Sequence, residues 1–130
     1  MYKFISRSII SVLIFSFIAC TMNSTVGVKH LVMFKFNEGT TQQQIDEFTT
    51  EFVSLRDRIP GIVAFDYGVN NSPENLNNGF THIYAISFTD NAARDAYLVH
   101  PEHEKFGEYA GKTGIIKEVF VLDYPPIEAK

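Results

Sequence analysis

The sequence predicts an α+β domain of the ferredoxin-like type, with helices on one face of a four-stranded antiparallel sheet. Three observations lead to this prediction: four short segments rich in β-branched and aromatic residues, amphipathic helical segments between them, and the order β-α-β-β-α-β. That order is the split βαβ arrangement. We therefore expect one domain over residues 28–124, followed by a short tail at 125–130.

The first strand is expected over residues 28–37, where side chains alternate between two largely apolar faces. One face would carry His30, Val32, Phe34 and Phe36, and the other Leu31, Met33 and Lys35. Because both faces are mostly apolar, we expect both to be covered.

An amphipathic helix should follow and end at Pro60-Gly61. Thr40 or Thr41 can cap its start, and Gln43 or Gln44 lies where a capping box requires it. Its apolar stripe consists of Ile45, Phe48, Phe52, Leu55 and Ile59. The other strands are expected over residues 62–69, 81–88 and 115–123, with a polar loop over 70–79.

One face of this sheet would meet water in a monomer. We expect Val32, Phe34 and Phe36 to lie on it, together with Tyr84 and Val121. An exposed apolar face of that size favours association, and a second copy packed face to face would cover it. The sequence therefore predicts a homodimer with two-fold symmetry.

The N-terminal segment resembles an export signal. Lys3 and Arg7 precede an apolar run over residues 8–19 that is too short to span a bilayer. The run ends at Cys20, the only cysteine, and resembles a bacterial lipobox. We expect residues 1–19 to be a signal peptide, Cys20 to be lipidated, and residues 20–27 to tether an exported, membrane-anchored lipoprotein on the periplasmic or cell-surface side. Ordinary signal cleavage and an uncleaved anchor are the alternatives.

Composition and spacing argue against nucleic acid and metal ions as partners. The chain has 11 basic and 15 acidic residues, a formal net charge of −4 and no basic run, which argues against nucleic acid. A metal site of His30, His82 and His103 is conceivable, but no close-spaced ligand signature supports it. We expect no metal and no cofactor.

The run Tyr97-Leu-Val-His-Pro-Glu-His103 is the most informative stretch for function. A helix over residues 91–99 should stop there and a short second helix should begin at Pro101, because proline cannot continue a helix through its own position. The run places a phenol and two imidazoles at a corner. Imidazole suits a general base near neutral pH, and a phenol can donate to a developing enolate oxygen. A structural role, with Tyr97 capping a helix and His103 bound to backbone, is the alternative.

These motifs together resemble the stress-responsive A/B barrel (Dabb) family, a branch of the dimeric α+β barrels. The matching segments are residues 29–36, 59–62, 68–70, 79–82, 87–88, 97–103 with Phe106, and 123–124. The resemblance implies a dimer with a hydrophobic pocket between helix and sheet. In a plant branch that cyclises polyketides, a tyrosine and a histidine of this run polarise a carbonyl and act as base. By motif position these are Tyr97 and His103, and His30 lines the same pocket.

Two functions remain open. The first is a lipid-anchored dimer that binds a small apolar molecule in this pocket. The second is a cofactor-free enzyme that acts on a hydrophobic carbonyl compound, as a cyclase or lyase or as a monooxygenase. The side chains expected to line the site are Val32, Phe34, Phe48, Phe52, His82, Tyr84 and Phe106. His82 could instead be a sheet histidine with its own hydrogen bonds.

Overall fold

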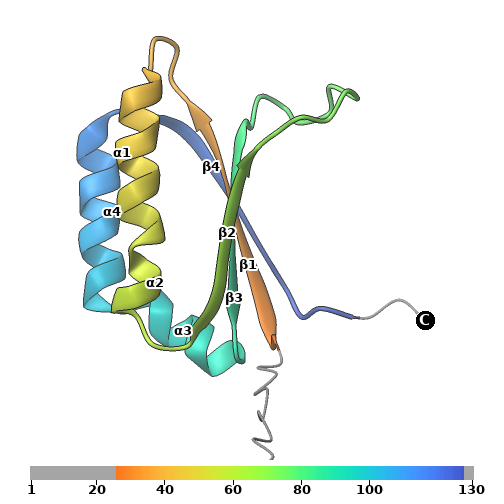
Figure 1. Ribbon diagram of the computed structural model, residues 1–130, viewed down its shortest axis with the longest axis vertical. Coiled ribbons are helices and arrows are strands. Elements are labelled where there is room, and N and C mark those ends of the chain that lie inside the picture. The colour runs from red at the N-terminus through yellow and green to blue at the C-terminus, as the bar shows by residue number, and fades with distance from the viewer. Residues whose placement is uncertain (1–25, 128–130) are drawn as a thin grey trace, which may run out of the picture.

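The computed structural model describes residues 26–127, which form two layers, a sheet and a layer of helices (Figure 1). The elements are β1 Val28–Phe36, α1 Gln42–Val53, α2 Leu55–Arg58, β2 Ile62–Val69, β3 His82–Phe88, α3 Asn91–Leu98, α4 Pro101–Thr113 and β4 Ile116–Tyr124. The predicted fold class is confirmed. The predicted signal peptide and Cys20 lie outside the described residues, and no helix within residues 26–127 could cross a membrane.

Strand β1 lies in the interior of the sheet. The strand order is β2-β3-β1-β4, and every neighbouring pair is antiparallel. The first strand of the chain therefore pairs with the last, and His30 lies directly opposite Asp123. This pairing determines which polar groups meet at the candidate site.

The expected first helix is present but interrupted. Thr41 caps α1 by accepting from the Gln44 N–H, while the Gln44 side chain accepts from the Thr41 N–H at 2.9 Å, which completes the capping box. The helix breaks at Ser54, whose hydroxyl donates to the Glu51 carbonyl at 2.5 Å. Serine competes for backbone groups in this way, and the chain continues as the separate short helix α2.

The corner at Pro101 forms as expected, but α4 is a full helix of 13 residues and not a short one. The His100 Nδ1 accepts from the Glu102 N–H at 3.2 Å and so caps α4, while Pro101 is its first residue. Gly114 ends α4 in the left-handed region at φ 67°. The expectation of a short helix underestimated this element, because Gly107 and Gly111 are tolerated within it.

The assignment of the open face was wrong. Val32, Phe34 and Tyr84 lie under the helices, with 6%, 5% and 0% of their surface exposed. Phe36 lies on the same face and contacts Phe48 of α1. The alternation was predicted correctly, but both faces of β1 are apolar, so the pattern alone could not indicate which one the helices cover.

Val121 differs from these buried residues. It lies opposite Val32 and so points to the helical side, yet it is 49% exposed. The reason is its position on β4, the edge strand, which the helices leave largely uncovered: every residue of β4 after Ile116 is exposed.

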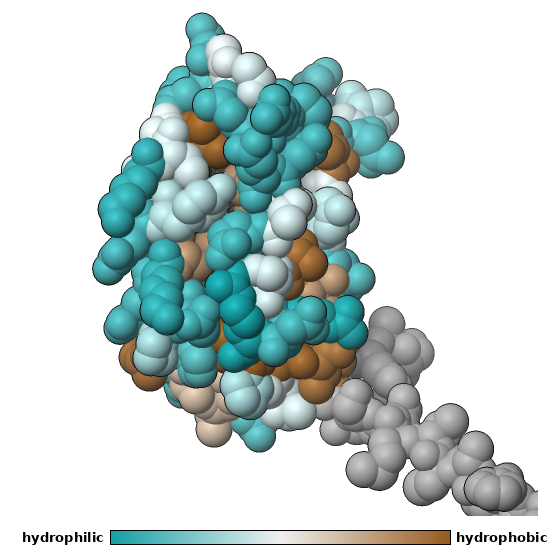
Figure 2. All heavy atoms as spheres, turned by 60° about the vertical axis from the view of Figure 1, so that its left-hand side comes forward, coloured by the Kyte–Doolittle hydropathy of each residue, from teal (hydrophilic) through white to brown (hydrophobic). Residues whose placement is uncertain are grey.

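Figure 1 shows that one face of the sheet carries no helix. That face is also apolar. By register it carries Leu31, Met33, Ile83, Ala85, Phe120 and Leu122. Phe120 and Leu122 are 46% and 45% exposed. The outer surface of the helices, by contrast, is largely hydrophilic (Figure 2). We call this apolar side of the sheet the bare face.

Candidate functional site

Four aromatic rings meet beneath the corner between α3 and α4. The Tyr97 ring lies 4.4 Å from the ring of His103, 5.8 Å from that of His30 and 5.1 Å from that of Phe88, measured between centroids. These residues come from α3, α4, β1 and β3. The structure thus brings together the three residues that the sequence nominated for chemistry.

The Tyr97 hydroxyl is enclosed and has no hydrogen-bond partner among the described residues. Burial raises the pKa of Tyr97 above its usual value, so the group remains a protonated donor near neutral pH. An unpartnered buried hydroxyl typically costs about 1–3 kcal/mol. Ser87, which shares a face with Ala85 on the bare side, has a similar orphan hydroxyl.

One ring nitrogen of His103 makes a hydrogen bond to the backbone, and the other is available to accept a proton. Its Nδ1 lies 3.2 Å from the Leu98 carbonyl, to which it donates. Burial lowers the pKa of His103, and the nearby His30 lowers it further, while the Leu98 carbonyl and Glu104 oppose this. The neutral imidazole therefore keeps its lone pair on Nε2, the nitrogen that can accept a proton. The backbone contact expected for a structural role is present, but it occupies only Nδ1.

An acidic residue that the sequence analysis did not nominate holds His30. The Asp123 Oδ1 accepts from the His30 Nδ1 at 2.6 Å, and Arg94 of α3 binds the other carboxylate oxygen. This arrangement ties β1, β4 and α3 together. Asp123 lies within a family-matching segment, but its partner depends on strand register, and no local pattern indicated Arg94.

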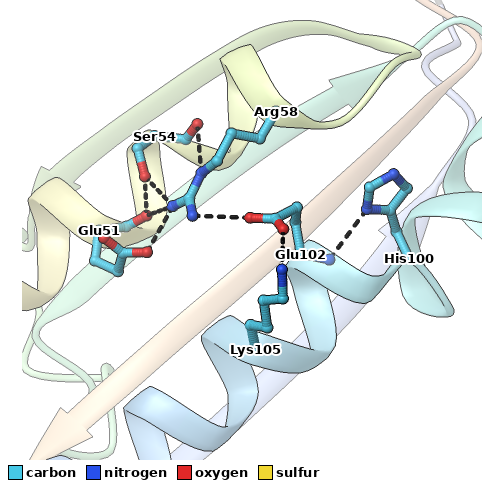
Figure 3. A network of polar contacts seen from close by, with 6 residues as sticks. All are labelled: Glu51, Ser54, Arg58, His100, Glu102 and Lys105. Atoms are coloured by element: carbon cyan, nitrogen blue, oxygen red, sulfur yellow. Dashed lines mark hydrogen bonds and ion pairs between the residues drawn. The ribbon is translucent and has the colours of Figure 1, made fainter.

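The start of α4 is held by a polar network (Figure 3). The Arg58 guanidinium of α2 donates to Glu51 Oε1 at 2.6 Å and to Glu102 Oε2 at 3.0 Å. Lys105 donates to the second oxygen of Glu102 at 2.6 Å, and these two cations lower the pKa of Glu102, Lys105 most strongly. Because Glu102 precedes His103, the network positions the helical turn that carries the imidazole.

The side chains predicted to line the pocket fill the space between helices and sheet. Phe52 stacks on Phe106 at 4.4 Å, and Phe34 meets Phe48 edge to face at 5.1 Å. The Tyr84 hydroxyl lies 2.6 Å from Thr49 Oγ1. Together with Val32 they form the buried core, so the pocket itself stays a prediction.

His82 is not part of this cluster. It opens β3, whereas Phe88, which contacts Tyr97, closes that strand. Its Nδ1 lies 2.9 Å from Thr81 Oγ1, and its ring packs on Phe36. Burial lowers the pKa of His82. Within residues 26–127 no three His, Cys, Asp or Glu residues are grouped to hold a metal ion.

The four-stranded antiparallel sheet with helices on one face places the chain in the class of ferredoxin-like α+β proteins. Comparison with known families gives the particular one. The chain belongs to the Stress responsive A/B Barrel Domain (Dabb) family, whose model matches residues 28–126.

Known relatives agree with this assignment. Olivetolic acid cyclase of Cannabis sativa is 30% identical over 101 residues, which are 78% of this chain and 98% of the relative. A crystal structure of a protein from Arabidopsis thaliana has a TM-score of 0.74 and 32% identity, over 79% of this chain and 98% of that one. A dimeric ferredoxin-like protein of unknown function from Jannaschia sp. CCS1 has a TM-score of 0.64 and 28% identity, over 76% and 98% of the two chains.

The lowered pKa of His103 predicts a pH-dependent stability. The folded pKa lies below the unfolded value of about 6.5, so the unfolded chain binds the proton first. This contribution is present above the unfolded pKa and is lost as pH falls through the folded pKa. We expect His103→Gln, which can still donate to the Leu98 carbonyl, to lose less stability than wild type between about pH 7 and about pH 5.

Urea unfolding at both pH values measures this difference. Burial also lowers the pKa of His82, so His82→Gln should likewise lose less stability than wild type on acidification. The double variant should lose the least stability. An unchanged pH dependence in His103→Gln would contradict the assignment.

Proposed function

We propose that this Dabb protein binds a small apolar molecule and that the Tyr97 hydroxyl donates to an oxygen of that molecule. The observation that carries the proposal is the enclosed hydroxyl, which has no acceptor among residues 26–127. A ligand carbonyl or hydroxyl oxygen at this point would restore the missing hydrogen bond and remove the cost of leaving it unmade.

The surroundings favour an apolar body for the ligand. Phe88 and the ring of His30 pack against the Tyr97 ring, and the exposed Val119 and Val121 extend along the helical side of β4 beyond Asp123. Because the hydroxyl is enclosed, a ligand can reach it only after a local opening, which we place at the corner between α3 and α4, where His103 is partly exposed.

A cofactor-free enzyme is the second candidate. Two observations favour it: the neutral His103 with Nε2 available beside Tyr97, and the relationship to olivetolic acid cyclase. In an aldol closure His103 would remove a proton from the carbon next to a carbonyl, and Tyr97 would hold the enolate oxygen. A lyase or a cofactor-independent monooxygenase would use the same pair.

The bare face supports a homodimer. Its apolar side chains, Phe120 and Leu122 among them, are left exposed by the part of the chain that the structure describes, and the related Jannaschia protein is dimeric. A second copy packed on this face would bury its apolar side chains, including those of β4. We further propose that the protein is exported and anchored by lipid on Cys20, as the first 20 residues suggest.

Replacing Tyr97 by Phe removes only the hydroxyl oxygen. We expect Tyr97→Phe to keep wild-type stability or gain slightly, because an orphan buried group is lost. It should bind a medium-chain methyl ketone about 5-fold more weakly, since a hydrogen bond is worth about 1 kcal/mol. NMR titration against the ketone and the matched alkane measures this. An equal preference for ketone over alkane in both proteins would disprove the role of Tyr97.

The variant His103→Ala separates the binding protein from the enzyme. If the wild type turns over a linear polyketone, and His103→Ala still binds that compound but no longer turns it over, the enzyme is supported.

The dimer can be tested on the bare face. We expect light scattering of the chain without residues 1–20 to give twice the monomer mass, and Leu122→Lys to shift the protein toward monomer, because a charge would be buried without a partner. Val99→Lys, on an exposed residue of the corner at the end of α3, is the control and should remain dimeric. A monomeric wild type would refute the dimer.

The lipid anchor predicts where the protein fractionates. We expect the wild type to sediment with membranes and to incorporate labelled palmitate, whereas Cys20→Ser should lose the label, because Cys20 is the only thiol available for acylation. Wild type that takes up no label would leave ordinary signal cleavage or an uncleaved anchor as the explanation.

A further inference from the structure

A hollow of about 330 Å³ opens on the bare face, under the loop between β2 and β3. Its floor comes from three strands and its wall from the loop, and the apolar side chains that line it are Met33, Ile83, Phe120, Leu76 and Phe80. The loop is tied down at its base: Lys35 Nζ lies 4.9 Å from the Phe80 ring and donates to Glu118 of β4 at 2.8 Å. The hollow is therefore a formed feature of the surface, continuous with the face proposed for dimerisation.

The chemistry of the hollow suits an extended proline-containing segment. Apolar and aromatic side chains line it, together with the loop residues Asn70, Asn77 and Asn78, whose side chains carry hydrogen-bond donors. Aromatic-lined grooves bind polyproline-type segments, whose proline rings pack well and whose carbonyls accept from side-chain donors. Such segments lose little entropy on binding because their backbone is already restricted.

This chain carries such a segment directly after β4. Tyr124-Pro125-Pro126-Ile127 leaves the sheet with Ile127 89% exposed and Tyr124 40% exposed. Figure 1 shows that both this segment and the loop project to the side of the bare face, the segment from one end of the sheet and the loop from the other. Within one copy, the segment therefore leads away from the hollow.

A second copy reverses this relationship. When two sheets face each other, a two-fold axis that lies between them and crosses the strands exchanges the ends of the sheet. The C-terminal segment of each copy then reaches the loop end of the other. An axis parallel to the strands would keep the segment at its own end and far from the hollow.

We propose that residues 124–127 of a second copy dock in this hollow, so that two reciprocal contacts close the homodimer. The inference rests on the proposed homodimer and adds the direction of its axis and the segment that each copy contributes. Apolar Ile127 and the proline rings would cover Leu76, the most exposed apolar side chain of the loop at 77%.

Cysteine pairing in the full chain tests the contact. In a Cys20→Ser background, Leu76→Cys combined with Ile127→Cys should give a covalent dimer in most of the protein on mild oxidation, because one copy's residue 127 meets the other copy's residue 76. Leu76→Cys with Val99→Cys, which places the second thiol at the corner between α3 and α4, is the matched control and should stay uncrosslinked on a non-reducing gel.

A second variant measures the contribution to affinity. Ile127→Asp should raise the dissociation constant of the dimer at least 10-fold, since it would place a charge in an apolar hollow. A wild-type dimer with no crosslink and no effect of Ile127→Asp would overturn the docking and leave the dimer intact. A wild-type monomer would overturn both.

Discussion

The packing of the α1 phenylalanines on one side of β1 is the constraint on which the rest of the structure depends. Phe34 meets Phe48 and Phe52 edge to face, and Phe52 in turn stacks on Phe106 of α4. Aromatic contacts of this kind add specific geometry to the burial of large apolar surfaces. They determine which face of the sheet the helices cover, and so place His30 inside and Met33 on the bare face.

Strand β4 connects the two faces. Its side chains alternate, so Asp123 points to the helical side and binds His30, whereas Leu122 and Phe120 point to the bare face. The candidate site and the proposed interface are therefore built from neighbouring residues of one strand. Any shift of β4 relative to β1 would move both, because a slip of one residue exchanges the faces of every side chain.

Sequence reasoning recovered the fold class and three of the four rings in the cluster, but not Phe88 or the polar groups around them. Local signals sufficed for the Thr41 cap and for the corner at Pro101, because capping and proline effects act within a few residues. The pairing of His30 with Asp123 spans 93 positions and depends on strand register, which no local pattern encodes. The identity of the covered face failed for a related reason: β1 is apolar on both sides, and only the partner helices distinguish them.

The exposed edge of β4 has a consequence for the life of a newly made chain. It presents nine residues of largely apolar strand whose outer backbone groups pair with no strand of the described chain. Such an edge is a template onto which any extended segment can add, including the same strand of an unfinished neighbour. We expect the risk of aggregation to be greatest while a single copy is alone, because the apolar side chains of β4 on the bare face are then uncovered together with this edge.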